Sequence, residues 1–72
     1  MKDKRLSILA ENIFWARRKT RYTQLKLAEL VDMSENSIGK IERAEQTPSA
    51  LALYDIAKAL GVDINDLYKG LD

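Results

Sequence analysis

The chain has 72 residues, with 12 Lys/Arg and 11 Asp/Glu, so its formal net charge is +1. A chain of this length buries only about 60% of its unfolded surface, which limits it to one small core. Cysteine and histidine are both absent, which excludes disulfides, thiolate metal sites and the usual neutral-pH base. Glycine-rich phosphate loops are missing as well. We therefore expect one domain spanning 1–72 that is not an enzyme, with no metal, cofactor or small-molecule ligand.

The start of the chain does not have the pattern of a targeting segment. Basic Lys2, Lys4 and Arg5 precede an apolar run that is cut short by Glu11 and Asn12. Such a brief run is typical of neither a signal peptide nor a membrane span. We expect a soluble, cytoplasmic protein.

The charges are unevenly distributed along the chain. Residues 1–43 contain 10 Lys/Arg and 6 Asp/Glu, a net charge of +4, whereas residues 44–72 contain 2 and 5, a net charge of −3. This asymmetry has two interpretations, a polyanionic partner on the N-terminal side or ordinary surface charge.

Two helices are predicted in the first part of the chain. Apolar residues at three- and four-residue steps predict a helix from about Lys4 to Lys19. Thr23 is a good N-cap for a second helix. Tyr22 before this cap and Leu27 after it are spaced as a hydrophobic staple.

The stretch Asp32-Met33-Ser34 interrupts the helical pattern and restarts it. Asp32 tolerates a left-handed turn because its short side chain can bond locally. Ser34 can cap a third helix from about Glu35 to Arg43, with Met33 and Ile38 as its staple. A tight turn therefore joins two short helices.

The rest of the chain predicts two further helices. Thr47-Pro48-Ser49 ends one segment, and Ser49 caps a fourth helix that ends before Gly61. Asp63 caps a fifth. The predicted fold class is all-α, a compact domain with short connections.

The order and spacing of these elements resemble the Cro/phage-repressor (XRE-type) helix-turn-helix family. The segments that match are "LAENI" at 9–13, "TQLKLAEL" at 23–30, "MSENSIGKIER" at 33–43 and "PSALALYDIAKALGVDINDLY" at 48–68. The resemblance implies a five-helix lambda-repressor-like DNA-binding domain. Its helix-turn-helix would span about 23–43, formed by the second and third helices, and its partner would be double-stranded DNA.

The sequence departs from the family pattern in the turns. Asp32 stands where the family usually has glycine, and Ala44 where it often has glycine or asparagine. Because alanine is strained at positive φ, we expect the loop after the third helix to differ from the family geometry. Glu45 and Gln46 replace residues that are often basic, which argues against phosphate binding by that loop.

The third helix carries the predicted base contacts. A helix in the major groove reads base edges with side chains near its N-terminus. The resemblance places four residues there: Glu35, Asn36, Ser37 and Lys40. Asn36 has the amide geometry for adenine, and Lys40 can donate to guanine. The alternative is a solvated polar face.

The resemblance also implies contacts to the DNA backbone and an internal ion pair. The predicted phosphate contacts are Thr23, Gln24, Ser34 and Arg43. The family commonly pairs an arginine on the first helix with the glutamate of "IER", here Arg17 and Glu42. We interpret this pair as structural, a clamp between the first and third helices. The alternative is that the contact also orients Arg17 towards a phosphate.

Two sets of apolar residues do not fit the main helical stripes. Phe14 and Trp15 are either covered by the fifth helix or form an exposed patch for another subunit or protein. The fifth helix offers a similar choice with Ile64, Leu67, Tyr68 and Leu71, one edge of which would pack on the core while the rest meets a two-fold mate.

The sequence therefore predicts a transcriptional regulator, most simply a repressor. It would read double-stranded DNA in a sequence-specific way as a homodimer on a palindromic operator. The competing hypothesis is a protein-interaction module of the same fold, such as an antitoxin-like or regulator-binding protein with weak DNA binding.

Overall fold

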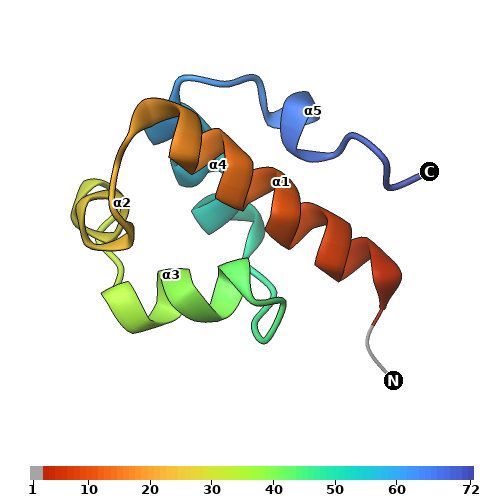
Figure 1. Cartoon of the computed structure of the whole chain (residues 1–72), viewed down its shortest axis with the longest axis horizontal. Coiled ribbons are helices and arrows are strands. Elements are labelled where there is room, and N and C mark those ends of the chain that lie inside the picture. The colour runs from red at the N-terminus through yellow and green to blue at the C-terminus, as the bar shows by residue number, and fades with distance from the viewer. Residues whose placement is uncertain (1–2) are drawn as a thin grey trace.

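The computed structural model describes residues 3–72, so Lys2 of the basic N-terminus lies outside the described residues. Residues 3–72 form five helices (Figure 1): α1 (Lys4–Thr20), α2 (Gln24–Leu30), α3 (Glu35–Glu42), α4 (Ala50–Leu60) and α5 (Ile64–Leu67). The predicted all-α class is therefore confirmed, and α2 to α5 each begin directly after the N-cap that the sequence predicts. Helix α1 ends one residue later than predicted, and α3 ends one residue earlier.

The side chain of Asp3 caps α1 by accepting a hydrogen bond from the Arg5 backbone N–H, 2.9 Å away. The Arg5 guanidinium bonds the same carboxylate. These side-chain and backbone bonds lower the pKa of Asp3 to about 2. At its other end α1 closes on Arg21, which has a left-handed backbone (φ 66°) that the sequence reasoning did not anticipate.

The turn between α2 and α3 has the predicted form. Asp32 is left-handed at φ 55°, and Met33 donates its backbone N–H to the Ala28 carbonyl oxygen across 2.9 Å. The Ser34 hydroxyl accepts from the Ser37 N–H and caps α3. Met33 packs against the core as expected of a staple. The turn thereby fixes how α3 crosses α2.

The loop after α3 corrects one expectation. Ala44 adopts φ 59°, so the predicted departure from left-handed geometry is wrong. The N–H of Ala44 donates to the Ile41 oxygen at 3.1 Å, and the N–H of Glu45 to the Lys40 oxygen at 2.8 Å. These two bonds form a Schellman motif, which closes a helix on a left-handed residue. The buried methyl group of Ala44 adds packing that offsets part of the strain.

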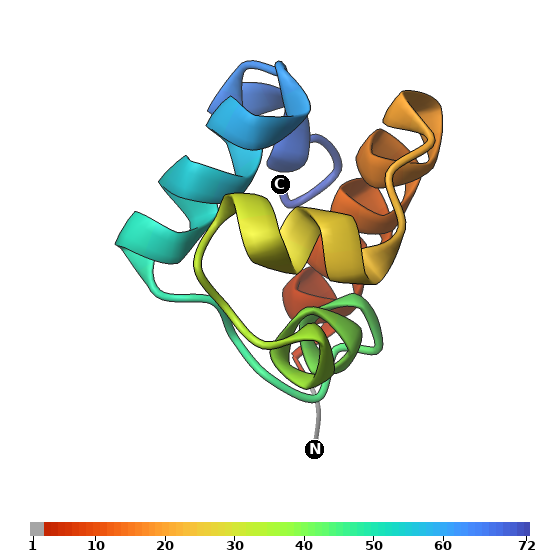
Figure 2. The same cartoon turned by 90° about the vertical axis from the view of Figure 1, so that its left-hand side faces the viewer.

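The core lies between α1 and the other helices, and its six largest fully buried side chains are Ile13, Leu27, Ile38, Ile41, Ile56 and Leu67. In Figures 1 and 2, α3 and α5 lie on opposite sides of the molecule, with α1 running between them. Asn12 of α1 holds the end of α5, because its Nδ2 donates to the carbonyl oxygens of Leu67 and Lys69, each 2.9 Å away. Within residues 3–72, no helix is long and apolar enough to cross a membrane.

Candidate nucleic-acid interface

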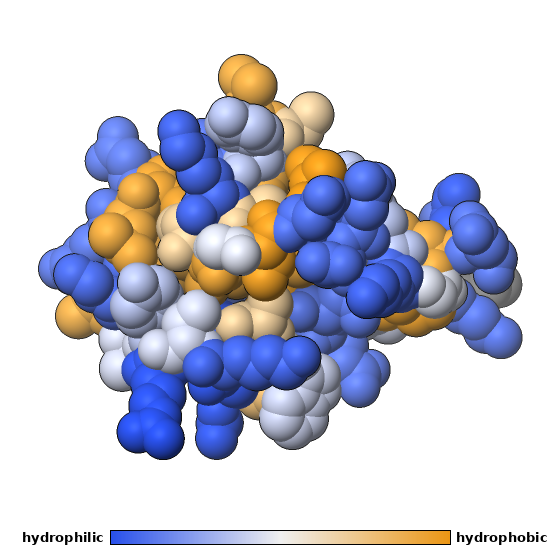
Figure 3. All heavy atoms as spheres, turned by 90° about the horizontal axis from the view of Figure 1, so that it is seen from above, coloured by the Kyte–Doolittle hydropathy of each residue, from blue (hydrophilic) through white to orange (hydrophobic). Residues whose placement is uncertain are grey.

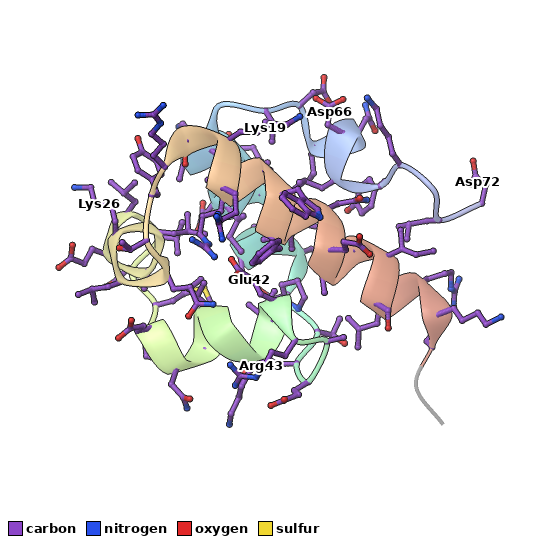
Figure 4. The ribbon with its side chains drawn as sticks, in the orientation of Figure 1. Lys19, Lys26, Glu42, Arg43, Asp66 and Asp72 are labelled. Atoms are coloured by element: carbon purple, nitrogen blue, oxygen red, sulfur yellow. The ribbon has the colours of Figure 1, made fainter. Side chains whose placement is uncertain are left out.

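The outward face of α3 is polar and lies on the side of the molecule away from α5. Asn36 and Lys40 are one helical turn apart on this face, and both are exposed. Ile38 and Ile41 are buried on the opposite face. Figure 4 shows Glu42 directed toward α1 and Arg43 on the far side of the α3 ribbon. The helix therefore presents amide and cationic donors outward at the spacing that groove reading needs.

Glu35 and Ser37 differ in how freely they can meet a ligand. Glu35 is the first residue of α3 and is exposed. Ser37 is half-buried, and its hydroxyl accepts a hydrogen bond from the Ser34 hydroxyl at 2.9 Å. The hydroxyl proton of Ser34 is thus committed within the protein, whereas the proton of the Ser37 hydroxyl can still be donated.

The predicted ion pair between Arg17 and Glu42 is present and buried. Arg17 Nε lies 2.7 Å from Glu42 Oε2, and Nη2 lies 2.9 Å from Oε1. The two side chains are only 8% and 2% exposed. Such a bidentate bond between desolvated charges has strict geometry, so it fixes the position of α3 relative to α1.

Two further residues complete this polar network. Gln24 Nε2 donates to Glu42 Oε1 at 3.0 Å, and Arg17 Nη1 donates to the Tyr22 carbonyl oxygen at 2.8 Å. The network therefore joins α1, α2, α3 and the loop before α2. Sequence reasoning found the ion pair but not these two members, since a glutamine and a backbone carbonyl give no pairing signal.

The other predicted phosphate contacts are placed differently. Thr23 Oγ1 accepts from the Lys26 N–H at 3.0 Å, which leaves the hydroxyl proton of this exposed residue for a ligand. The amide of Gln24 is partly committed to Glu42. Arg43 is exposed and pairs with Glu45, with Nε 3.0 Å from Oε2.

The aromatic residues of α1 form a partly exposed cluster beside two guanidinium groups. The rings of Phe14 and Trp15 meet edge to face, with centroids 5.1 Å apart. The guanidinium carbons of Arg17 and Arg18 lie 5.5 and 5.6 Å from the Phe14 centroid. Trp15 is 54% exposed, so α5 does not cover it. Of the two predicted alternatives, burial under the fifth helix or an exposed patch, Trp15 fits the exposed patch.

The residues predicted as a patch at the end of the chain do not act together. Leu67 is only 1% exposed and belongs to the core, so its assignment to a partner surface is wrong: the single turn of α5 points this side chain inward. Ile64 lines a hollow on the α4 side. Leu71 lines a separate hollow beside Leu6. Tyr68 is exposed. Viewed from above in Figure 3, hydrophobic atoms emerge as separate patches between charged side chains.

Sequence reasoning missed two exposed apolar residues of α4. Leu51 is 76% exposed and Tyr54 is 54% exposed. They lie three residues apart on one face of the helix, and Tyr54 shares its hollow with Ile64. The signal was available, because neither residue belongs to the inner stripe of α4.

Comparisons with known proteins agree with this geometry. The family model described as "Helix-turn-helix" (HTH_3) matches residues 13–67. A search by sequence among curated proteins finds no match.

Within residues 3–72, no group of three or more His, Cys, Asp or Glu side chains is placed to hold a metal ion.

Several solved structures have a similar fold. The restriction-modification controller protein C.AhdI from Aeromonas hydrophila superposes with a TM-score of 0.87 at 21% identity, covering 92% of this chain and 100% of that one. The clp gene regulator ClgR from Corynebacterium glutamicum gives 0.86 at 22% identity, covering 93% and 71%. An HTH_3 family transcriptional regulator from Vibrio cholerae gives 0.83 at 25% identity, covering 90% and 36%.

Proposed function

The chain belongs to the helix-turn-helix family of DNA-binding transcriptional regulators, and we propose that it recognises a specific duplex sequence by inserting α3 into the major groove. The observation that carries this proposal is the buried network of Arg17, Glu42 and Gln24. It holds α3 with its apolar face inward and its polar face outward. A recognition helix must be held in this way, because base edges are read by side chains in fixed register.

Each residue on the outward side of α3 has a role that follows from its chemistry. Asn36 would donate and accept at an adenine edge, and Lys40 would donate to guanine acceptors. Ser37 has one hydroxyl proton for a base or a phosphate. Glu35 would accept from a cytosine amino group. Thr23 and Gln24 would contact phosphates with their side chains, and Ser34, whose hydroxyl proton is donated to Ser37, would do so through its backbone N–H. These contacts would set the orientation of the protein on the duplex.

The protein would act as a homodimer on a palindromic operator. One recognition helix contacts too few bases to be selective, and a two-fold dimer doubles them. Two α3 helices reach successive major grooves only if they lie about 34 Å apart on one side of the dimer. A mate stacked on the far side of the molecule from α3 would turn its own α3 away, which argues against contact through Tyr68 and Leu71.

The surface of α4 and the start of α5 suits the dimer contact better. Leu51 and Tyr54 are exposed apolar residues, and Ile64 lines the same hollow as Tyr54. Asp55 and Lys58 lie on the same helix and are exposed. Because a two-fold interface sets each surface against its own copy, the aspartate of one protomer can meet the lysine of the other.

Sedimentation tests this dimer directly. Replacing Leu51 and Tyr54 by Asp should give a folded monomer with weaker operator binding, while Tyr68→Asp, the matched control, should remain a dimer. A wild type that is monomeric at tens of micromolar, with and without DNA, would contradict the dimer. A dimer that survives the double change but is lost on Trp15→Asp would move the contact to the aromatic cluster of α1.

One observation favours the competing function of a protein-interaction module. Phe14 and Trp15 form an aromatic surface beside two arginines, and Trp15 is half exposed. Such patches often mark protein contacts. Selection of bound sequences from a random duplex library, at stated salt, separates the two functions. A palindromic consensus with steep salt dependence supports the operator-binding function, and salt-independent absence of duplex binding supports the module.

A further inference from the structure

We infer that Arg43 reads a base edge, most simply a guanine, and that Gly39 and Glu45 position it for this task. The inference rests on the proposed function and deepens it, because the sequence alone placed Arg43 among the phosphate contacts. Three features of the structure carry it: the path of the side chain, the pairing of its guanidinium and the face of α3 that it occupies.

The side chain of Arg43 folds back along α3 over a glycine. A Cβ atom built on Gly39 would lie 2.8 Å from Arg43 Nη1. The guanidinium therefore occupies the space that any other residue at position 39 would fill. Arg43 lies at the C-terminal end of α3, beyond the residues that usually read bases, but this path carries its donors one turn back toward the N-terminal end.

Glu45 holds the guanidinium by one edge and leaves the other edge open. Arg43 Nε lies 3.0 Å from Glu45 Oε2, and Nη2 lies 3.5 Å from Oε1. The fork formed by Nη1 and the second proton of Nη2 is not engaged by these two bonds. The pair as a whole carries no net charge, which weakens its attraction to a phosphate, but the edge of the guanidinium that faces away from Glu45 still matches two acceptors in one plane.

The position of Arg43 on α3 directs this fork to the groove. Asn36, Lys40 and Arg43 follow each other at steps of four and three residues, so they share one face of the helix. All three are exposed. Among base edges in the major groove, guanine offers two adjacent acceptors, O6 and N7, to a donor-only side chain. The chemistry of Arg43 therefore selects a G·C pair next to the bases contacted by Asn36 and Lys40.

The test is binding selection from a random duplex library with the full chain and three single variants, followed by affinities at several salt concentrations. Arg43→Lys keeps the charge and removes the fork. Glu45→Ala removes the partner of the guanidinium. Gly39→Ala places a methyl carbon 2.8 Å from the present position of Nη1, so the guanidinium has to shift. It also replaces a helix-interior glycine by a better helix former, so the variant should fold.

All three variants should lose preference at the same G·C pair and keep it elsewhere in the site. Because a bidentate contact discriminates by about 1–3 kcal/mol, Arg43→Lys should bind the preferred site about 10-fold to 100-fold less tightly, with the salt slope unchanged. Lys26→Ala, which removes an exposed cation on α2, should leave every base preference intact and is the matched control.

Two results would overturn the inference in distinguishable ways. If the wild type selects a consensus and Arg43→Lys and Gly39→Ala keep every base preference, the inference fails alone. Arg43 would then be a phosphate contact, and Arg43→Ala should reduce the salt slope by about one unit. If the wild type shows no sequence preference on duplex DNA, the proposed function fails and the inference fails with it.

Discussion

The two halves of the molecule are held together by different means. In the first half, α1, α2 and α3 are joined by a buried network of charged and polar groups around Glu42. Their three connections each contain a non-glycine residue at positive φ, namely Arg21, Asp32 and Ala44. In the second half, α4 and α5 pack through apolar side chains, and the residues at positive φ after them are Gly61 and Gly70.

This difference separates positional accuracy from stability. A buried ion pair adds little net stability, because desolvation offsets much of its attraction, but it enforces one geometry. A left-handed backbone at a non-glycine residue costs roughly 1–2 kcal/mol. The half that carries the recognition helix therefore bears two costs that fix the geometry of α3, in addition to supplying its share of the apolar core, and the half formed by α4 and α5 bears neither.

The largest expected effect comes from breaking the network. Glu42→Ala would leave the Arg17 guanidinium buried without its carboxylate, and removal of one partner of a buried pair costs about 3–5 kcal/mol. Chemical denaturation at fixed protein concentration measures this loss. Lys69→Ala, which breaks an exposed pair with Asp66, is the control and should cost at most about 1 kcal/mol.

A double-mutant cycle with Arg17→Ala then separates pairing from packing. If the two side chains act as a clamp, the double variant should be much less destabilised than the sum of the single ones. A coupling energy of zero would mean that the two residues contribute independently, and the proposed fixing of α3 by charge would be wrong.

The second prediction concerns the apolar half. Leu67 of α5 is buried in the core. Leu67→Ala should therefore lower the free energy of unfolding by about 3 kcal/mol, through lost burial and the cavity left behind. Its effect on base preference should be nil, because α5 lies on the far side of the molecule from α3. Leu25→Ala, at a half-exposed leucine, should change stability by about 0.5 kcal/mol or less. A changed consensus in the Leu67 variant would contradict the separation of the two halves.

The sequence predicted most of the first half and less of the second, for physical reasons. N-caps are local signals, so Thr23, Ser34 and Ser49 placed their helices correctly. The ion pair between Arg17 and Glu42 came from the family resemblance. By contrast, the burial of Leu67 depends on how far α5 extends and which side it packs on, which local patterns do not determine.

The loop geometry at Ala44 shows a second limit. Residue preference predicted that alanine would avoid positive φ, but two backbone hydrogen bonds of the helix end outweigh that preference. Residue-level propensity describes the average free-energy cost of a conformation, and the surrounding structure determines whether other interactions offset that cost. The predicted base contacts remain predictions, since their roles depend on DNA.

The third prediction tests the polar contact that joins α1 to the apolar half. Asn12 donates to two carbonyl oxygens at the end of α5. Asn12→Ala should cost about 1 kcal/mol, because water can satisfy the exposed Lys69 oxygen and, in part, the half-buried Leu67 oxygen. Amide hydrogen exchange should speed up in α5 while α2 and α3 are unaffected. Equal acceleration in all helices would mean that Asn12 supports the whole fold rather than this one contact.

The smallest expected effect is a gain in stability rather than a loss. It comes from a direct comparison of the turns of the two halves. Ala44→Gly would relieve roughly 1–2 kcal/mol of left-handed strain and add about 0.4–1 kcal/mol of unfolded-state entropy, so stability should rise by about 0.5 kcal/mol. Gly61→Ala is the mirror experiment. An added Cβ there meets nothing within 4 Å, so the loss measures backbone strain minus the unfolded-state entropy that alanine removes, with no steric contribution. If Gly61→Ala destabilises while Ala44→Gly does not stabilise, the buried methyl of Ala44 contributes more than its strain costs, and the first half is less strained than its dihedral angles indicate.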